Sequence, residues 1–199
     1  MSKVNRQTRL RSKLVRLVIL GGPGSGKGTQ GKQLCHELGI PWISTGDIFR
    51  AAIAQSSELG IKAAPYVEQG ELVPDSVAIE LIRERLVQSD TENGWLLDGY
   101  PRTAFQAEEL DFLLDDLGKR LNWAIWLDVP EPILIDRSLG RSSWRDRPDI
   151  IRRRIELFHE RTIPIMEYYE PRGRLLKIDG NQPAEAVHRD ILKALIVDR

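Results

Sequence analysis

The strongest constraint on the fold of this chain is a glycine-rich turn that directly follows a short apolar segment. Residues 14–20 (LVRLVIL) have the length and composition of a buried strand, and the turn GGPGSGKGTQ occupies residues 21–30. A strand, a glycine turn and a helix in this order surround a bound anion with backbone N–H groups, so they predict a phosphate-binding loop. The turn nearly matches the pattern G-x-x-x-x-G-K-[ST], with Lys27 as its lysine, but Gly28 replaces the hydroxyl residue that binds Mg²⁺.

Apolar runs and helical patterns alternate along the rest of the chain. Strands are expected at residues 14–20, 41–44, 95–98, 122–129 and 174–179. Helices are expected at residues 26–38, 104–117, 131–141, 148–169 and 183–197, and further helical segments through residues 46–88 are expected to break at Gly60, Gly70 and Pro74. This alternation predicts an α/β fold whose five-stranded parallel sheet has helices on both faces. Ligands of such sheets bind beyond the carboxyl ends of the strands, where the glycine loop and Asp98 fall.

The composition excludes several classes of protein. The chain has 199 residues, 41% of them hydrophobic and 29% charged, with a formal net charge of zero, so we expect one globular domain and do not expect nucleic acid as a partner. We expect no membrane span, since no apolar run approaches the ~20 residues that one needs. The single cysteine, Cys35, excludes a multi-cysteine zinc site, and we interpret it as a core residue.

The N-terminus is basic, and the first acidic residue of the chain is Glu37. We interpret residues 1–13 as a solvated basic tail that precedes a single domain at residues 14–199. The cytoplasm is the expected compartment, and an organelle is the alternative if the tail is a targeting remnant.

Two polar clusters lie near the expected strand ends. In STGDIFR (residues 44–50), Ser44 or Thr45 can cap a helix from which Arg50 projects. In LLDGYPRTAFQ (residues 97–106), Asp98 ends a buried strand, where a carboxylate can hold the waters of a Mg²⁺ ion.

A third cluster is rich in arginine. Its members are Arg137, Arg141, Arg145, Arg147, Arg152, Arg153 and Arg154. Arginine pairs with phosphate oxygens through two hydrogen bonds and stays charged, which suits the stabilisation of a phosphoryl group during transfer.

Seven motifs in this order resemble the adenylate kinase family of nucleoside monophosphate kinases. They are GGPGSGKGTQ, ISTGDIFR, ELVPD, LLDGYPRTAFQ, LDVP, DRSLGR and KIDGNQPAE, and the resemblance covers about residues 17–196. It implies a P-loop NTPase-like fold with a helical segment at residues 44–73 that binds the monophosphate, and with a minimal lid at about residues 140–147. In this family GKGT is usual and Mg²⁺ is held largely by nucleotide phosphates and water. Gly28 is therefore a family feature, and Asp98 is the implied partner of the metal's waters.

The resemblance also implies roles for individual residues. Those implied for ATP are Gly24, Ser25, Gly26, Lys27, Gly28, Thr29, Arg137, Arg141 and Gln182. Those implied for AMP are Thr45, Arg50, Glu71, Leu72, Val73, Gly99, Tyr100, Pro101, Arg102, Gln106 and Arg154. The implied catalytic residues are Lys27, Arg102, Arg141, Arg145 and Arg154. Gln106 would read the adenine edge of AMP, and Thr45 favours AMP because relatives that use UMP and CMP tend to have alanine there.

The lid departs from the family pattern. The family's further lid arginine falls on Ser143 when counted back from Arg154, and the segment 142–147 is shorter than the usual short lid. Arg145 and Arg147 are the nearest candidates, and we predict that Arg145 replaces the missing arginine.

The sequence therefore predicts a monomeric, Mg²⁺-dependent adenylate kinase that maintains adenine nucleotide balance through ATP + AMP = 2 ADP. One alternative is a UMP/CMP kinase, which differs in its acceptor. The other is a non-catalytic nucleotide-binding protein whose basic tail contacts nucleic acid or an anionic surface.

Overall fold

A parallel sheet forms the centre of the computed structural model, which describes residues 14–140 and 147–197. Within these residues the sheet has five strands in the order β2-β3-β1-β4-β5. The strands are β1 (Val15–Leu20), β2 (Trp42–Ser44), β3 (Gly94–Asp98), β4 (Trp123–Asp128) and β5 (Leu175–Asp179). The predicted α/β fold with a five-stranded parallel sheet is confirmed.

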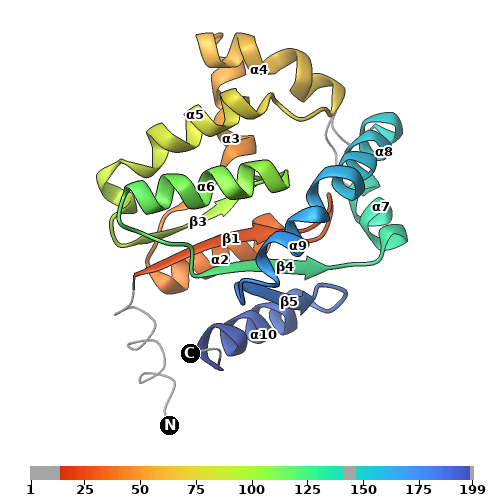
Figure 1. Cartoon of the computed structure of the whole chain (residues 1–199). Coiled ribbons are helices and arrows are strands. Elements are labelled where there is room, and N and C mark those ends of the chain that lie inside the picture. Colours follow the sequence, from red (N-terminus) through yellow and green to blue (C-terminus); the bar gives the residue numbers. More distant parts are fainter. Residues whose placement is uncertain (1–13, 141–146, 198–199) are drawn as a thin grey trace.

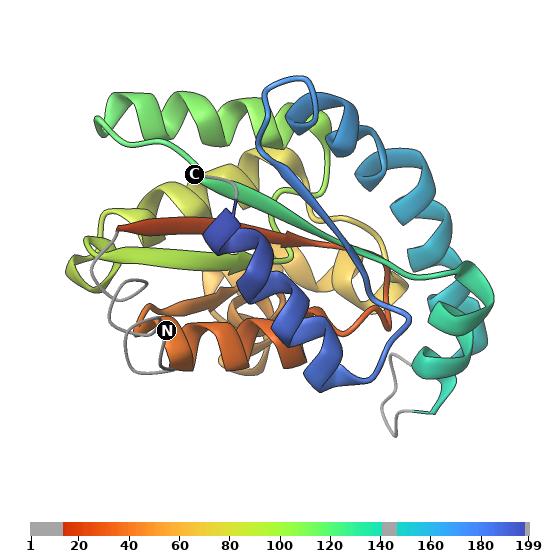
Figure 2. The same ribbon diagram turned by 90° about the horizontal axis from the view of Figure 1, so that it is seen from below.

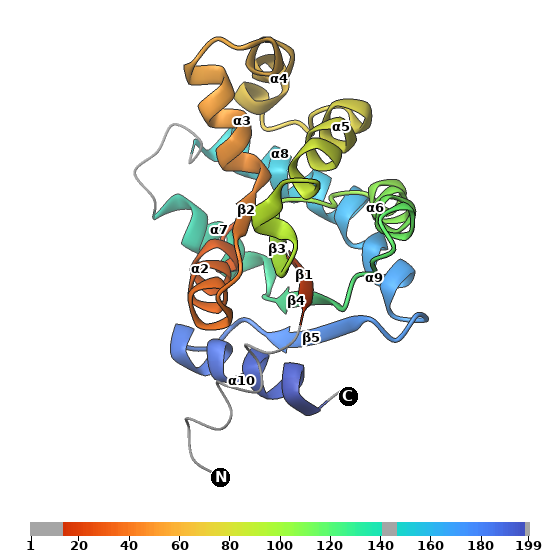
Figure 3. The ribbon, with the colours of Figure 1, turned by 90° about the vertical axis from the view of Figure 1, so that its left-hand side faces the viewer.

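Helices connect the strands and cover both faces of the sheet (Figures 1 and 2). They are α2 (Lys27–Leu38), α3 (Thr45–Ala54), α4 (Glu58–Gln69), α5 (Asp75–Leu86), α6 (Ala104–Asp116), α7 (Glu131–Leu139), α8 (Pro148–Leu157), α9 (Pro164–Tyr169) and α10 (Ala184–Val197). Figure 3 looks along the sheet and shows α2 and α10 on one side of it, with α5, α6 and α9 on the other.

The central strand β1 explains this layering, because all six of its residues are buried. Leu17 and Ile19 belong to the apolar core that also contains residues of α2 and α10. Val18 and Leu20 point the opposite way, into the core formed with α5, α6 and α9. Cys35 lies in the first of these cores, where burial raises the pKa of its thiol to about 12, as befits a core residue.

Helix α3 follows directly on the edge strand β2, and α3 and α4 pack on each other past this edge of the sheet (Figures 1 and 3). The predicted break at Gly60 is wrong, since this buried glycine lies inside α4. A Cβ atom there would overlap the carbonyl oxygen of Ala52 in α3, so Gly60 permits the two helices to touch. The chain turns instead at residues 55–57, while Gly70 ends α4 and Pro74 caps α5 as predicted.

The long helix predicted at residues 148–169 is interrupted. A π-helical turn, η3 (Phe158–Thr162), separates α8 from α9. Pro164 explains it, because proline has no backbone N–H to donate to residue 160, and the N–H of Ile163 reaches back to the oxygen of Phe158 at 3.0 Å.

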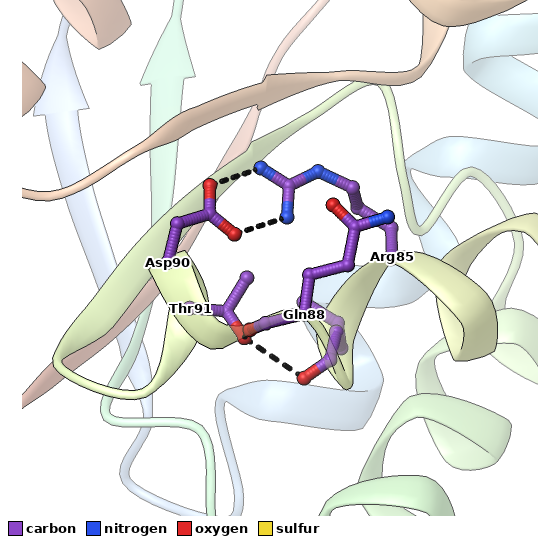
Figure 4. A network of polar contacts seen from close by, with 5 residues as sticks. Arg85, Gln88, Asp90 and Thr91 are labelled. Carbon is purple, nitrogen blue, oxygen red and sulfur yellow. Dashed lines mark hydrogen bonds and ion pairs between the residues drawn. The ribbon is translucent and has the colours of Figure 1, made fainter.

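The connection from α5 to β3 is fixed by polar contacts around the short helix η1 (Ser89–Thr91), as Figure 4 shows. Both Nη atoms of Arg85 donate to the carboxylate of Asp90, at 2.8 and 2.6 Å. The hydroxyl of Thr91, a fully buried residue, donates to the carbonyl oxygens of Leu86 and Gln88. These contacts lie in the connection that leads into β3, whose last residue is Asp98.

In the described part of the chain, every helix is too short or too polar to cross a bilayer.

Candidate active site

The glycine loop has the backbone of an anion cradle. Gly21, Gly24 and Gly26 have positive φ angles of 144°, 81° and 96°, and Gly26 is the residue before α2. A Cβ atom at Gly24 would lie 2.6 Å from the oxygen of Leu134, so only glycine lets the loop sit against α7. The Nζ atom of Lys27 donates to the oxygens of Gly21 and Gly22 at 2.7 and 2.8 Å, which holds its charge over the loop.

Asp98 ends β3 beside this loop, in register with Ile19 of β1 and Ser44 of β2. A Cβ atom on Gly28 would lie 4.0 Å from Oδ2 of Asp98, in ordinary contact. The position that carries a hydroxyl in the common loop pattern therefore faces this carboxylate. Burial raises the pKa of Asp98, and the neighbouring charges of Lys27 and Arg102 oppose that rise.

These surroundings fit a hydrated magnesium ion. Mg²⁺ prefers oxygen ligands, keeps several waters and is commonly held through one or two carboxylates together with substrate phosphates. Asp98 supplies a half-buried carboxylate next to the glycine loop, and a cation there would offset the cost of partly removing this charge from water. Among residues 14–140 and 147–197, no group of three or more His, Cys, Asp or Glu side chains could hold a metal by itself.

The first turn of α3 is positioned by Ser44 and Thr45. Ser44 caps the helix by accepting a hydrogen bond from the N–H of Asp47 at 3.2 Å. The buried Thr45 donates its hydroxyl to the oxygen of Asp98 at 3.3 Å. A Cβ atom on Gly99 would lie 2.6 Å from this hydroxyl, and Gly99 has a φ angle of 85°, so both space and backbone require glycine. Arg50, one turn along α3, pairs with Asp47.

The turn after β3 holds Arg102 and Gln106. The Tyr100–Pro101 peptide bond is cis, and the Nε atom of Arg102 donates to the oxygen of Gly99 at 2.9 Å. The oxygen of Arg102 accepts from the hydroxyl of Thr162 at 3.0 Å, which ties this turn to the π-helical turn. Burial lowers the pKa of Arg102 and Asp98 opposes this, but a guanidinium stays protonated, so a positive charge is held at the floor of the site.

Two cavities open onto these residues. The larger, about 330 Å³, is lined by the glycine loop, Lys27, Asp98 and Arg102 among others. The smaller, about 80 Å³, is lined by Thr45, Glu71, Val73, Tyr100 and Gln106 among others. Both cavities share the lining residues Gly46, Arg50, Gly70, Leu72, Gly99, Arg102 and Arg154. The structure thus brings the glycine loop and a second, smaller pocket together around shared arginines.

Four of the predicted ATP residues lie outside both cavities. Ser25 is buried within the loop and Thr29 is exposed on α2. Arg137 donates to the backbone oxygen of Gly180 at 3.1 Å, which joins α7 to the β5–α10 turn that carries Gln182. Arg141 and Arg145, and with them most of the predicted lid, lie outside the described residues. Arg147 is exposed just before α8 and pairs with Asp149 at 3.0 Å.

Several neighbours of the site were not predicted. Trp42 and Thr162 line the larger cavity, although nothing in their local sequence indicates a site. Arg153 was assigned only to the arginine cluster, yet its Nε and Nη2 atoms donate to the carboxylate of Glu71 at 2.5 and 3.2 Å, joining α8 to the α4–α5 connection. Asp75, which follows the proline of the ELVPD motif, accepts from Nε2 of Gln106 at 2.6 Å. These contacts join distant segments and become visible only in three dimensions.

Comparison with known proteins agrees with this geometry. A family model described as "Adenylate kinase" matches residues 19–174. The chain is 61% identical to "Adenylate kinase 2" of Nostoc sp. (strain PCC 7120 / SAG 25.82 / UTEX 2576) over 183 residues, which cover 92% of this chain and 100% of that protein. It is 54% identical over 181 residues to "Adenylate kinase 2" of Synechocystis sp. (strain ATCC 27184 / PCC 6803 / Kazusa), which cover 91% of this chain and 100% of that protein. The predicted family is confirmed: this chain belongs to the adenylate kinase family.

Proposed function

We propose that the protein is an ATP:AMP phosphotransferase that catalyses ATP + AMP = 2 ADP. The observation that supports this most directly is the pair of adjoining cavities, one at the phosphate cradle and one at Gln106, with Arg102 and Arg154 lining both. Two phosphate-bearing molecules bound side by side need such shared cations where their phosphates meet. The family membership and the similarity to curated adenylate kinases favour AMP over UMP or CMP as acceptor.

In this proposal the glycine loop holds the phosphates of ATP. Backbone N–H groups of residues 24–29 and the N-terminus of α2 face the anion, and Lys27 adds a full charge. Arg137 on α7 and Gln182 in the β5–α10 turn lie against the ATP adenine, and Arg141 contacts its phosphates.

AMP occupies the smaller cavity. Thr45, Arg50 and Arg102 hold its phosphate side, and the backbone of residues 71–73 with Gln106 holds the base. An oxygen of the AMP phosphate attacks the γ-phosphorus of ATP in line, a new P–O bond forms, and the bond to the β–γ bridging oxygen breaks. The arginines stabilise the charge that spreads over the transferring oxygens.

Magnesium belongs to the same proposal, held by Asp98 through water and by the nucleotide phosphates. Bound there, it would neutralise charge on the phosphate oxygens and orient them. We also propose that the enzyme acts as a cytoplasmic monomer.

We further propose that Arg145 supplies the lid charge that the family usually places at the position of Ser143. Arg147 is the weaker candidate because its side chain is exposed and pairs with Asp149. Arg145→Ala should then reduce turnover far more than Arg147→Ala. Intact turnover in Arg145→Ala with loss in Arg147→Ala would reverse the assignment.

The decisive experiment measures ADP formation from ATP and Mg²⁺ with AMP, UMP, CMP or no acceptor. Rapid ADP formation with AMP alone supports the proposal. Preference for UMP or CMP would contradict it, and ADP formation without any acceptor would show that water reaches the phosphoryl group. Bound ATP without turnover would favour a non-catalytic nucleotide-binding protein.

A further inference from the structure

Gln106 lies in the wall of the smaller cavity with both ends of its amide engaged. It is 2% exposed. Its Oε1 atom accepts from the backbone N–H of Arg102 at 2.8 Å, and its Nε2 atom donates to Oδ1 of Asp75 at 2.6 Å. Asp75 is the first residue of α5 and does not itself line the cavity.

Arg102 donates a hydrogen bond to the Gln106 amide and Asp75 accepts one from it, although the two ends of this amide are nearly identical in shape. An amide turned by 180° would fit the same space with its oxygen and nitrogen exchanged. In that orientation the Nε2 hydrogens would meet the N–H of Arg102, and Oε1 would meet a carboxylate, which only accepts. Both contacts would then be repulsive, so Asp75 and Arg102 together hold one orientation.

Hydrogen bonds also hold the backbone of Gln106, so only the orientation of its side-chain amide could still vary. Its N–H donates to Oγ1 of Thr103 at 3.1 Å, and its oxygen accepts from the hydroxyl of Tyr100 at 3.2 Å. After these bonds the amide retains one lone pair on Oε1 and one hydrogen on Nε2. A base in the cavity can therefore meet one acceptor and one donor in a set order.

That order distinguishes two purines of the same shape. The edge of adenine presents a donor at N6 and an acceptor at N1, whereas hypoxanthine presents an acceptor at O6 and a donor at N1. An amide held in one orientation can form both hydrogen bonds with one of these edges. With the other edge, donor would face donor and acceptor would face acceptor. We propose that Asp75 is a positioning residue that sets the direction of the Gln106 amide and thereby selects a 6-amino over a 6-oxo purine monophosphate. This inference rests on the proposed function.

Asp75→Asn is the most informative variant. It keeps the size of the side chain and its hydrogen bond to Gln106, but it no longer requires Gln106 to be the donor. An asparagine amide can present oxygen or nitrogen, so it supports either orientation of Gln106. The matched control is Glu131→Gln, which also neutralises an acid at the first residue of a helix, α7, where Glu131 pairs with His159 on the surface and lines neither cavity. Asp75→Ala is a second variant that removes the contact altogether.

The experiment measures kcat and KM with AMP and with inosine monophosphate, together with the Kd of each by calorimetry. For Asp75→Asn the ratio of kcat/KM for AMP to that for inosine monophosphate should fall by about tenfold, because a charged acceptor that enforces one orientation of Gln106 is replaced by a neutral amide that permits both. The change should lie in KM for the acceptor, with KM for ATP unaltered. Glu131→Gln should keep the wild-type ratio, and in a Gln106→Met background Asp75→Asn should have no further effect.

An unchanged ratio in both Asp75→Asn and Asp75→Ala would overturn the inference. An equal loss with both acceptors would also overturn it, since that result indicates a structural role only. Failure of the wild-type protein to use AMP at all is a different result, and it would contradict the proposed function instead.

Discussion

At the scale of single residues, Asp98 places a carboxylate in surroundings that disfavour its ionised form. Burial raises its pKa despite the nearby Lys27 and Arg102. A group whose pKa is higher in the folded than in the unfolded state binds its proton more tightly when folded. Its ionised form therefore destabilises the fold at neutral pH, and this destabilisation shrinks as the pH falls through the folded-state pKa and is absent below the unfolded-state pKa.

Asp98→Asn should consequently separate stability from activity. At neutral pH we expect Tm to rise by about 2–4 °C, the effect of roughly 1 kcal/mol in a chain of this size. Turnover should fall by at least about a hundredfold if the carboxylate holds the metal's waters, by analogy with the loss of other charge-stabilising groups. Calorimetry and the ADP assay measure the two effects.

The pH dependence provides the control for this variant. The advantage of Asp98→Asn in Tm should shrink as the pH is lowered, because the wild-type carboxylate then takes up its proton. The wild-type enzyme should lose activity over the same pH range. A variant that is less stable than wild type at pH 7 would contradict this account.

At the scale of elements, the pair α3 and α4 depends on one close approach. Thr45 and Arg50 stand on α3, and α4 packs on it through Gly60, where a side chain would overlap the backbone of Ala52. The position of α3 in the site is therefore coupled to the packing of α4.

Gly60→Ala should force the two helices apart. We expect destabilisation of about 1–3 kcal/mol, as for other overpacked sites, and a higher KM for AMP with a nearly unchanged KM for ATP. Gly140→Ala is the control for stability, because Gly140 has a φ angle of −74° and its Cβ atom would lie 3.8 Å from the nearest neighbour. Equal Tm values for Gly60→Ala and wild type would show that the helices adjust without strain.

The ion pair between Arg153 and Glu71 joins α8 to the connection that follows α4. Hydrogen bonds to Glu71 and then to Glu156 raise the pKa of Arg153, but the pair is partly solvated and contributes little to overall stability. Its expected effect is on the placement of residues 71–73 near AMP.

Arg153→Met and Glu71→Gln should each raise KM for AMP about two- to threefold, and the double variant should match the single ones. High salt should reduce the difference from wild type by screening the pair. Arg172→Met, which removes a surface arginine on Tyr168, is the matched control. Additive effects in the double variant would mean that the two residues act separately.

Prediction from the sequence was most successful where a local pattern determines the structure. The apolar runs located all five strands of the described sheet, because a strand buried on both faces needs a nearly continuous apolar run such as VRLVIL, in which Arg16 is the one polar residue. Gly60 was misjudged because a glycine that ends a helix and one that permits helix contact look alike in sequence. The π-helical turn at residues 158–162 was missed because it depends on how Pro164 is accommodated after a helix has formed.

The site shows the same division. The glycine loop and the residues from Asp98 to Gln106 lie where their motifs placed them, lining the two cavities or standing beside them. The roles implied for these residues remain predictions. Asp75 was quoted as part of a motif without a role, since its contact with Gln106 depends on the packing of α5 against α6.

At the scale of the whole molecule, the basic residues 1–13 precede the part of the chain that the structure describes. The Nostoc relative matches over 100% of its own length with 92% of this chain, so a complete relative needs fewer residues than this chain has. Removal of residues 1–13 should therefore leave turnover with AMP within about twofold of the full chain.

The same truncation tests whether the tail has a partner of its own. Salt-dependent binding of nucleic acid by the full chain that is lost on truncation would assign that binding to the tail. A large loss of turnover would show instead that the tail supports the domain.

The order of the strands has a consequence for folding of the chain while it is synthesised on the ribosome. β1 is the middle strand of the sheet, yet residue 15 pairs with residue 94 and residue 17 with residue 123. β1 is therefore synthesised first but remains unpaired the longest. The time between synthesis of β1 and of its first neighbour β3 is about 4–16 s at a rate of about 5–20 residues per second. During that interval an apolar strand with two unpaired edges is exposed, and the nascent chain should be a substrate for chaperones until β3 arrives.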